Sequence, residues 1–188
     1  MAKNILVGLG ANLPSDRGGP QATIQAAVQR LAQNAIEIQA VSAVYRTAPV
    51  PASDQPDFIN IALAARTALS AQQLLHLFQN IERQLGRQPA ERWSARTLDI
   101  DLLAYGSHVL PSASAWHDVA YSDDPAAILA EPVVPHPRLH KRAFVLKPLM
   151  DIAADWDHPV LHKTVKQLMV NEDVAAQVAS VVQICVDL

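Results

Sequence analysis

One short segment, Leu98-Asp-Ile-Asp-Leu102, constrains the fold more than any other, because apolar and acidic residues alternate along it. Alternation with a period of two is the pattern of a half-buried β-strand, in which successive side chains point to opposite faces of a sheet. The three apolar residues are therefore predicted to face a core together. Asp99 and Asp101 face the other side together, with their backbones about 6–7 Å apart along the strand.

Two arginines and a tryptophan precede this strand: Arg92, Trp93 and Arg96. Paired carboxylates beside arginines suit a site that handles Mg²⁺ and polyphosphate, because the acids hold the metal and the guanidinium groups bind phosphate oxygens that the metal leaves free. The alternative is a solvated sheet face on which the two acids bind nothing. The segment alone does not decide between the two interpretations.

The composition limits the classes of protein that can carry such a site. The chain has 188 residues and is 50% hydrophobic, which predicts one domain with a core and excludes a disordered or fibrous protein. Its 15 basic and 18 acidic residues give a net charge of −3, which argues against a general nucleic-acid binder. The single Cys185 excludes an internal disulfide and a cysteine zinc site, and we predict a buried thiol.

A cytoplasmic protein is expected. The N-terminus lacks the apolar core of a signal peptide, and no apolar run approaches the length of a membrane span. A reducing compartment also agrees with the single cysteine.

The hydrophobic pattern up to Tyr105 predicts four strands and two helices. Strands are expected over 5–9, 36–46, 57–65 and 99–105, and helices after Pro20 and after the capping residue Ser70. The order β-α-β-β-α-β is the ferredoxin-like pattern, with both helices on one face of the sheet and the other face free for a ligand. The predicted fold class is α+β, with a long loop insertion at 106–132 and a C-terminal extension.

Two further groups of residues suggest binding. Phe58 and Asn60 share one face of their strand, where a ring can stack on a flat heteroaromatic ligand and a carboxamide can pair with it, although a plain aromatic contact beside a turn asparagine fits as well. A basic cluster lies between two apolar anchors and suggests anion binding, although such clusters are usually solvated. It consists of Arg138, His140, Lys141 and Arg142.

The remaining segments carry weaker signals. The proline-containing loop 47–56 is predicted to be a binding loop or a plain connection. Residues 106–132 are expected to be weakly structured, as in a lid or mobile insertion. The C-terminal part suggests a helix around Thr164–Val170 and a Val/Ile-rich end without a functional signal.

Five segments, taken in order, resemble the motifs of the 6-hydroxymethyl-7,8-dihydropterin pyrophosphokinase family of folate biosynthesis. These are Gly8–Leu13, Tyr45–Pro49, Asp54–Asn60, Arg92–Asp101 and Pro135–Phe144. The resemblance implies a cytoplasmic, Mg²⁺-dependent transferase that moves the terminal diphosphate of ATP to the hydroxymethyl group of the pterin and releases AMP. It implies two Mg²⁺ ions, small-molecule substrates without nucleic acid or membrane, and a monomer, with the oligomeric state left open. One pyrophosphokinase domain over 1–188 is expected, with a core at about 3–155 and an extension at 156–188.

The same resemblance implies the site residues. Asp99 and Asp101 resemble the ligands of the Mg²⁺ ions and, with Arg92 and Arg142, the catalytic residues. The implied pterin-binding residues are Thr47, Ala48, Val50, Phe58, Asn60 and Phe144. The implied ATP-binding residues are Gln79, Glu82, Arg87, Arg92, Trp93, Arg96, Ile100, His136 and Arg142.

Some positions depart from the family pattern. Ser94-Ala95 stand where Gly-Pro is common, Ala11 replaces a serine, and Glu131 replaces an ATP-side arginine. The loop from Gly86 to Arg92 is one residue shorter than in another form of the family, and the 106–132 stretch is longer than in compact members. These departures concern the loops and leave both aspartates in place.

Two other functions stay open. A ferredoxin-like sheet also serves in RNA-binding and ligand-sensing modules, but the carboxylates on the open face would repel phosphates without a metal. A family member that binds ATP and has lost activity is the other possibility. The intact Asp99, Asp101 and Asn60 argue against it.

Overall fold

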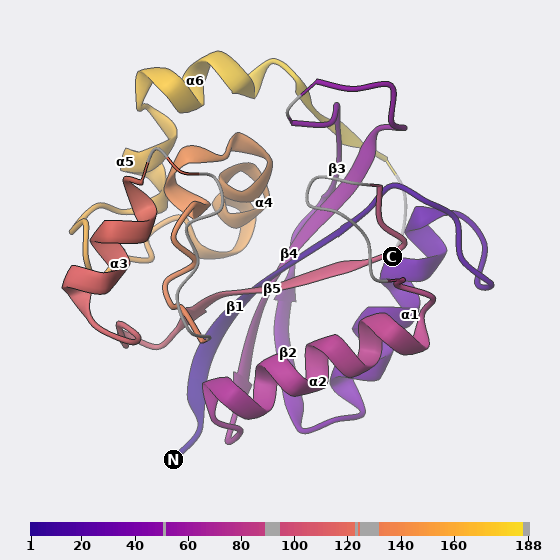
Figure 1. Ribbon diagram of the computed structural model, residues 1–188, viewed down its shortest axis with the longest axis horizontal. Coiled ribbons are helices and arrows are strands. Elements are labelled where there is room, and N and C mark those ends of the chain that lie inside the picture. Colours follow the sequence, from indigo (N-terminus) through magenta and orange to yellow (C-terminus); the bar gives the residue numbers. More distant parts are fainter. Residues whose placement is uncertain (51, 89–94, 123, 125–131, 186–188) are drawn as a thin grey trace.

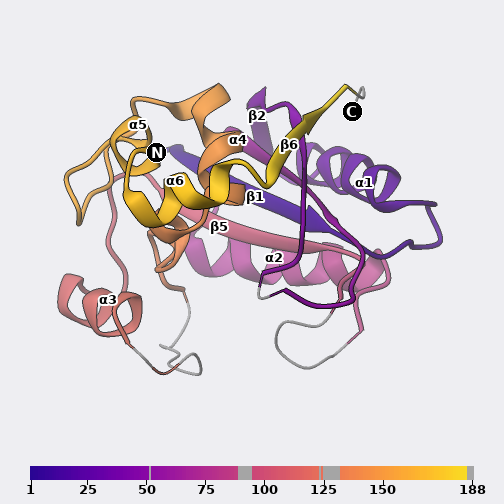
Figure 2. The same cartoon turned by 90° about the horizontal axis from the view of Figure 1, so that it is seen from above.

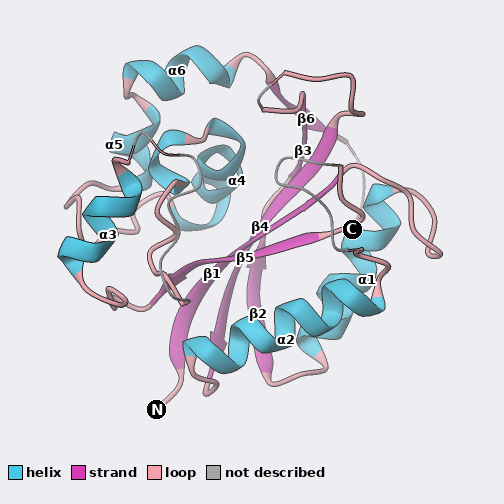
Figure 3. Cartoon of the chain, viewed as in Figure 1, coloured by secondary structure: helices cyan, strands magenta, loops and turns pink. Residues whose placement is uncertain are grey.

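The computed structural model describes residues 1–50, 52–88, 95–122, 124 and 132–185, which form a six-stranded antiparallel sheet with helices on both faces (Figures 1 and 3). The strand order is β5-β1-β4-β3-β6, and β2 pairs with β4 beside β3. The strands are β1 (Lys3–Ala11), β2 (Ile36–Val41), β3 (Val44–Thr47), β4 (Phe58–Thr67), β5 (Asp99–Tyr105) and β6 (Val181–Ile184). The helices are α1 (Pro20–Ala32), α2 (Ala71–Gln84), α3 (Ala113–Ala120), α4 (Ala143–Ala153), α5 (Val165–Met169) and α6 (Glu172–Val178).

The predicted β-α-β-β-α-β core is confirmed. Helix α2 begins with the predicted capping box, because Gln73 donates its backbone N–H to the Ser70 hydroxyl while its side chain accepts the Ser70 N–H. It is followed by Gly86 with a φ of +90°, a conformation that favours glycine. The apolar faces of α1 and α2 and the alternate residues of β1, β4 and β5 enclose the larger core. Leu98, Ile100 and Leu102 belong to it, as the alternation predicted.

The long strand expected over 36–46 is interrupted, so that β2 and β3 form separate strands. Ser42 lies between them, and its hydroxyl forms two hydrogen bonds with backbone groups. The Ala62 N–H donates to Ser42 Oγ at 2.9 Å, and the hydroxyl donates to the Ala43 carbonyl at 2.7 Å. A side chain that competes with backbone partners in this way breaks the regular pairing. Period-two alternation does not reveal such a break.

The expectation that the second face of the sheet is free was wrong for part of that face. Helices α4, α5 and α6 pack there and enclose a second core, which includes Leu6, Tyr45, Ala62 and Leu103 of the sheet. Figure 2 shows α4 and α6 on one side of β1 and β5 and α2 on the other, and Figure 1 shows α1 beside α2. The Val/Ile-rich C-terminal end forms β6, which pairs with β3. An open area remains on this face, toward the N-terminal ends of β4 and β5.

Two smaller expectations were also wrong. The stretch 106–132 is not weakly structured throughout, because α3 forms within it with Ser112 as N-cap. Its Trp116 is fully buried, and the indole N–H donates to the Pro135 carbonyl at 2.7 Å. Cys185 is exposed rather than buried, because it follows the last paired residue of the edge strand β6.

Two buried histidines, His140 and His158, pack against Trp116 with ring centroids 5.6 Å and 5.1 Å away. Burial lowers the pKa of each ring to about 4, from an ordinary value of 6.5. Between these values an unfolded chain binds protons that the folded chain excludes. Stability is therefore fully present above pH 6.5 and is lost as the pH falls toward 4, by roughly 3 kcal/mol for each ring.

We expect His140→Phe to remove about half of this loss. Among the described residues neither ring nitrogen of His140 has a hydrogen-bond partner, so phenylalanine keeps the packing and abandons no bond. Urea unfolding at pH 7.5 and pH 4.5 measures the difference, with the exposed His76→Gln on α2 as control. An equal pH dependence in the variant and the unmodified chain would contradict the prediction.

Candidate functional site

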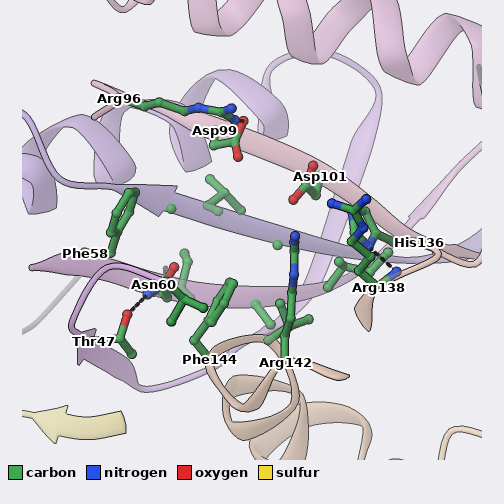
Figure 4. Close-up of a pocket in the computed structure, with 18 of the residues that line it drawn as sticks. Thr47, Phe58, Asn60, Arg96, Asp99, Asp101, His136, Arg138, Arg142 and Phe144 are labelled. Atoms are coloured by element: carbon green, nitrogen blue, oxygen red, sulfur yellow. Dashed lines mark hydrogen bonds and ion pairs between the residues drawn. The ribbon is translucent and has the colours of Figure 1, made fainter. Parts of the chain in front are cut away.

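Two cavities adjoin on the open part of the sheet. The first has a volume of about 250 Å³ and lies over β1, β4 and the start of α4. The second, of about 970 Å³, lies between α2, β5 and the segment at 132–142. They share Arg96, Asp99, Asp101, His136, Arg138 and Arg142, so their junction is lined by two carboxylates, three arginines and a histidine (Figure 4).

The floor of the first cavity is flat because β1 carries glycines there. In the antiparallel register Gly10 lies between Asn60 on β4 and Asp99 on β5. A Cβ atom on Gly10 would stand 3.0 Å from Asn60 Oδ1, so a larger residue would displace the carboxamide. The local sequence thus gives a flat molecule direct access to the backbone and to Asn60.

The walls of this cavity combine aromatic and polar groups. Asn60 is 7% exposed, and its Nδ2 donates to Thr47 Oγ1 at 2.8 Å, which fixes the orientation of the carboxamide. Phe58 comes from the same face of β4, and Phe144 comes from the first turn of α4 (Figure 4). The arrangement can hold a flat ring between two phenyl groups while a carboxamide pairs with the ring edge.

Asp99 and Asp101 both point to the junction of the cavities, as the alternation predicted (Figure 4). Burial raises the pKa of both carboxyls above their ordinary value, and for Asp99 the Asp101 carboxylate raises it further. Arginines oppose this effect: Arg96 Nη1 and Arg87 Nη1 lie 2.7 Å and 2.8 Å from Asp99 Oδ1. Nearby cations are therefore needed to keep both Asp99 and Asp101 ionised.

Glu82 lines the second cavity and is only 5% exposed. Its carboxylate accepts the Ile100 N–H at 2.7 Å and forms an ion pair with Arg87. Burial raises the pKa of Glu82 to about 7, against the opposing charge of Arg87. Glu82 therefore ties α2 to the strand between the two aspartates and positions Arg87 near Asp99.

The basic cluster predicted at 138–142 divides between two environments. Arg138 and Arg142 line the cavities, His140 is buried against Trp116, and Lys141 donates to the Ala120 carbonyl at 2.6 Å. The Nδ1 atom of His136 accepts the Arg138 N–H at 3.1 Å, and burial lowers the pKa of this ring to about 3. A neutral His136 then carries its proton on Nε2 and can donate to an anion.

The family model described as 7,8-dihydro-6-hydroxymethylpterin-pyrophosphokinase matches residues 6–154. The chain belongs to this family. A 2-amino-4-hydroxy-6-hydroxymethyldihydropteridine pyrophosphokinase of Synechocystis is 36% identical over 91% of this chain and 77% of its own. That of Pseudomonas aeruginosa is 36% identical over 82% of this chain and 83% of its own. The folic acid synthesis protein fol1 of Pneumocystis carinii is 33% identical over 83% of this chain, which spans 18% of that protein.

Solved structures agree on the fold of this pyrophosphokinase family member. Wild-type Plasmodium falciparum HPPK-DHPS with pteroate superposes with a TM-score of 0.68 at 13% identity, over 99% of this chain and 48% of that one. At this identity the likeness concerns the fold alone. None of the described helices combines the length and the apolar character that a membrane span requires.

The structure of this pyrophosphokinase groups the predicted site residues by cavity. All six residues predicted for the pterin line the first cavity: Thr47, Ala48, Val50, Phe58, Asn60 and Phe144. The described residues predicted for ATP line the second: Gln79, Glu82, Arg87, Arg96, Ile100, His136 and Arg142. Three positions lie outside the described residues: Arg92, Trp93 and Glu131, the last of which differs from the family pattern. The binding roles of all these residues stay predictions.

The family resemblance implied no site role for Arg138, which the sequence placed only in the candidate anion-binding cluster, and no role was predicted for Asn12. Arg138 lines both cavities, and the signal for it was its position four residues before Arg142. Asn12 is buried and joins two segments: its Nδ2 donates to the Pro56 carbonyl at 3.1 Å, and its Oδ1 accepts the Arg96 N–H at 2.7 Å. Both bonds span more than 40 residues of sequence, so no local pattern could indicate them.

Proposed function

We propose that the first cavity binds 6-hydroxymethyl-7,8-dihydropterin, that the second binds ATP, and that diphosphate transfer takes place at Asp99 and Asp101, where they meet. Family membership supports the reaction itself, which is pyrophosphokinase activity on hydroxymethyldihydropterin in folate synthesis. The observation that carries the proposal is the junction, where two carboxylates and three arginines are shared by both cavities. A diphosphate passing from one ligand to the other must cross this point.

On the pterin side, we assign ring recognition to Asn60, with Phe58 and Phe144 stacking on the two ring faces. Backbone groups of Thr47, Ala48 and Val50 complete the set. The proposal is supported by the flat floor at Gly10 and by the fixed orientation of the Asn60 carboxamide. A buried carboxamide rejects rings that cannot match it, because its polar atoms would then lose their partners.

On the ATP side, we assign the adenosine part to the wall that includes Gln79, Glu82 and Ile100, and the phosphates to the cations. Arg87, Arg96, His136 and Arg142 are the proposed phosphate-binding residues among those described. Arg92 and Trp93, which lie outside the described residues, remain predicted members of this set. Guanidinium groups suit phosphate because they donate two parallel hydrogen bonds.

Mg²⁺ fits the chemistry of the two aspartates. They supply hard oxygen ligands, and burial together with their mutual repulsion makes a cation favourable beside them. Among the described residues no three His, Cys, Asp or Glu side chains form a cluster suited to a metal. Mg²⁺ usually takes one or two carboxylates and completes its shell with phosphates and water, so we propose two ions bound between Asp99, Asp101 and the nucleotide. When bound, they would neutralise charge on the phosphates.

The protein itself acts by positioning. The pterin hydroxyl oxygen attacks the β-phosphorus of ATP, the bond from that phosphorus to the bridging α,β-oxygen breaks, and AMP leaves as the hydroxyl proton is lost. Asn60 and the phenyl rings orient the attacking alcohol. Arg142 and Arg96, on opposite sides of the junction, bind the transferring group, and neutral His136 can donate from Nε2. Phosphoryl transfer depends mainly on such positioning and charge stabilisation, so no side chain needs to serve as general base.

Incubation with MgATP and the pterin alcohol, followed by separation of the nucleotides, tests the proposed function. AMP that forms only when the pterin is present supports it. A 6-methylpterin control lacks the hydroxyl and must give none. ADP would indicate single-phosphoryl transfer, and no turnover would favour a binding module; either result contradicts the proposal.

Asn60→Ala is expected to weaken pterin binding by about tenfold to a hundredfold and to leave ATP binding unchanged. The substitution removes the proposed ring reader while the ATP-side cations keep their positions. Calorimetry with each ligand measures the two affinities, with Asn4→Ala, an exposed site on β1, as control. Equal losses for both ligands would contradict the assignment of Asn60 to the pterin.

A further inference from the structure

Arg142 is the N-cap residue of α4, but its side chain makes no capping hydrogen bond. The side chain reaches instead toward Asp101 at the junction of the cavities (Figure 4). Its guanidinium carbon lies 5.5 Å from the Phe144 ring centroid, and burial lowers its pKa below the ordinary value. The position of the Arg142 guanidinium therefore depends on the backbone on both sides of Arg142.

The side chain of Gln177 contacts the backbone on both sides of Arg142. Its Oε1 accepts the Ala143 N–H at 3.2 Å, and its Nε2 donates to the Lys141 carbonyl at 3.0 Å. The same Nε2 donates to the Asp173 carbonyl at 2.8 Å, one turn earlier in α6, which holds the carboxamide in its orientation. Gln177 thus contacts residues 141 and 143, and it lines neither of the two cavities described above.

The hydrogen bonds of Gln177 satisfy backbone groups at the start of α4. The first N–H groups of a helix have no partner within the helix, and a side chain usually caps them locally. Here Arg142 is the capping position but directs its side chain to the junction, so Gln177 satisfies the Ala143 N–H from another helix. A carboxamide can accept from one peptide and donate to the other, which fixes both peptides that flank Arg142.

We propose that Gln177 is a positioning residue that holds Arg142 for diphosphate transfer. The inference rests on the proposed function, and it assigns a role to the C-terminal segment. Gln177 lies beyond residues 6–154, the part that the family model matches. Helix α6 packs against α4 and the turn at 139–141. Figure 1 shows α6 and α4 at the upper left.

Gln177→Met tests the proposal, because methionine keeps the length of the side chain and removes its hydrogen bonds. We expect kcat to fall about five- to tenfold, the effect of losing one or two hydrogen bonds that act in the transition state. The Kd of the pterin should stay unchanged in calorimetry. Gln183→Met, at an exposed position of β6, serves as the matched control and should keep full activity.

A double-mutant cycle separates positioning from general structure. If Gln177 acts only through Arg142, Gln177→Met has no further effect on kcat in an Arg142→Ala background. An equal fold-change in both backgrounds, or an unchanged kcat in the single variant, would overturn the proposal for Gln177 and leave the proposed function intact. An unmodified chain that forms no AMP would instead overturn the proposed function, and this inference with it.

Discussion

Replacing Asp101 with asparagine is expected to lower kcat by about 10³-fold without unfolding the protein. The substitution keeps the shape and removes the charge that, in the proposed site, holds Mg²⁺ against the transferring diphosphate; losing such stabilisation of transition-state charge has an effect of this order. Stability should not fall, because the Asp101 carboxylate has a raised pKa and repels Asp99. AMP release at increasing Mg²⁺ concentrations, together with thermal unfolding, measures both effects.

The exposed Asp155→Asn is the control for this variant, since it makes the same chemical change far from the cavities. Near-normal turnover of the Asp101 variants, Asp101→Asn or Asp101→Ala, in saturating Mg²⁺ would show that the proposed metal assignment is wrong. A loss of turnover that accompanies a lower unfolding midpoint would attribute the effect to stability instead.

Trp116→Ala is expected to destabilise the fold by about 3–5 kcal/mol, the usual effect of truncating a fully buried aromatic side chain. Trp116 has no exposed surface and anchors α3 by its 2.7 Å bond to the Pro135 carbonyl. The substitution leaves a cavity beside His140 and His158 and leaves this carbonyl without its partner. Because His136 follows Pro135 directly, we also expect a loss of turnover at temperatures where the variant is still folded.

Urea unfolding at neutral pH measures this effect, and two further variants divide it. Trp116→Phe retains most of the ring and loses the hydrogen bond, so a loss of about 1–2 kcal/mol is expected. Trp156→Ala changes a half-buried tryptophan of the same cluster and should cost less than Trp116→Ala. If Trp116→Ala cost less than 1 kcal/mol, α3 would not be an anchored part of the fold, and 106–132 would be the mobile insertion that its composition predicted.

The sequence predicted most where a property is local. The cap at Ser70, the helix that follows it and the alternation from Leu98 to Leu102 each depend on residues within a few positions of one another, and all are confirmed. The family and the β-α-β-β-α-β core are confirmed as well. The break at Ser42 was missed because the hydroxyl's partner, the Ala62 N–H, belongs to another strand.

The functional groups follow the same division. The alternation of residue types predicted that Asp99 and Asp101 share one face of a strand. In the same way it predicted that Phe58 and Asn60 share one face of another strand, β4. Their roles in the reaction stay predictions. The sequence could not show that the two faces are the same, because that depends on the pairing of both strands with β1.

What the sequence by itself determined is therefore the type of each element, the face on which its chemical groups lie and the family. Only the tertiary structure decided how those groups meet: that α4, α5 and α6 cover part of the open face, that two cavities share the aspartates, and that Gln177 contacts both neighbours of Arg142. The physical reason is range. Periodicity and capping arise from neighbours along the chain, whereas a cavity or a cap from another helix depends on contacts between residues far apart in sequence, which no local pattern encodes.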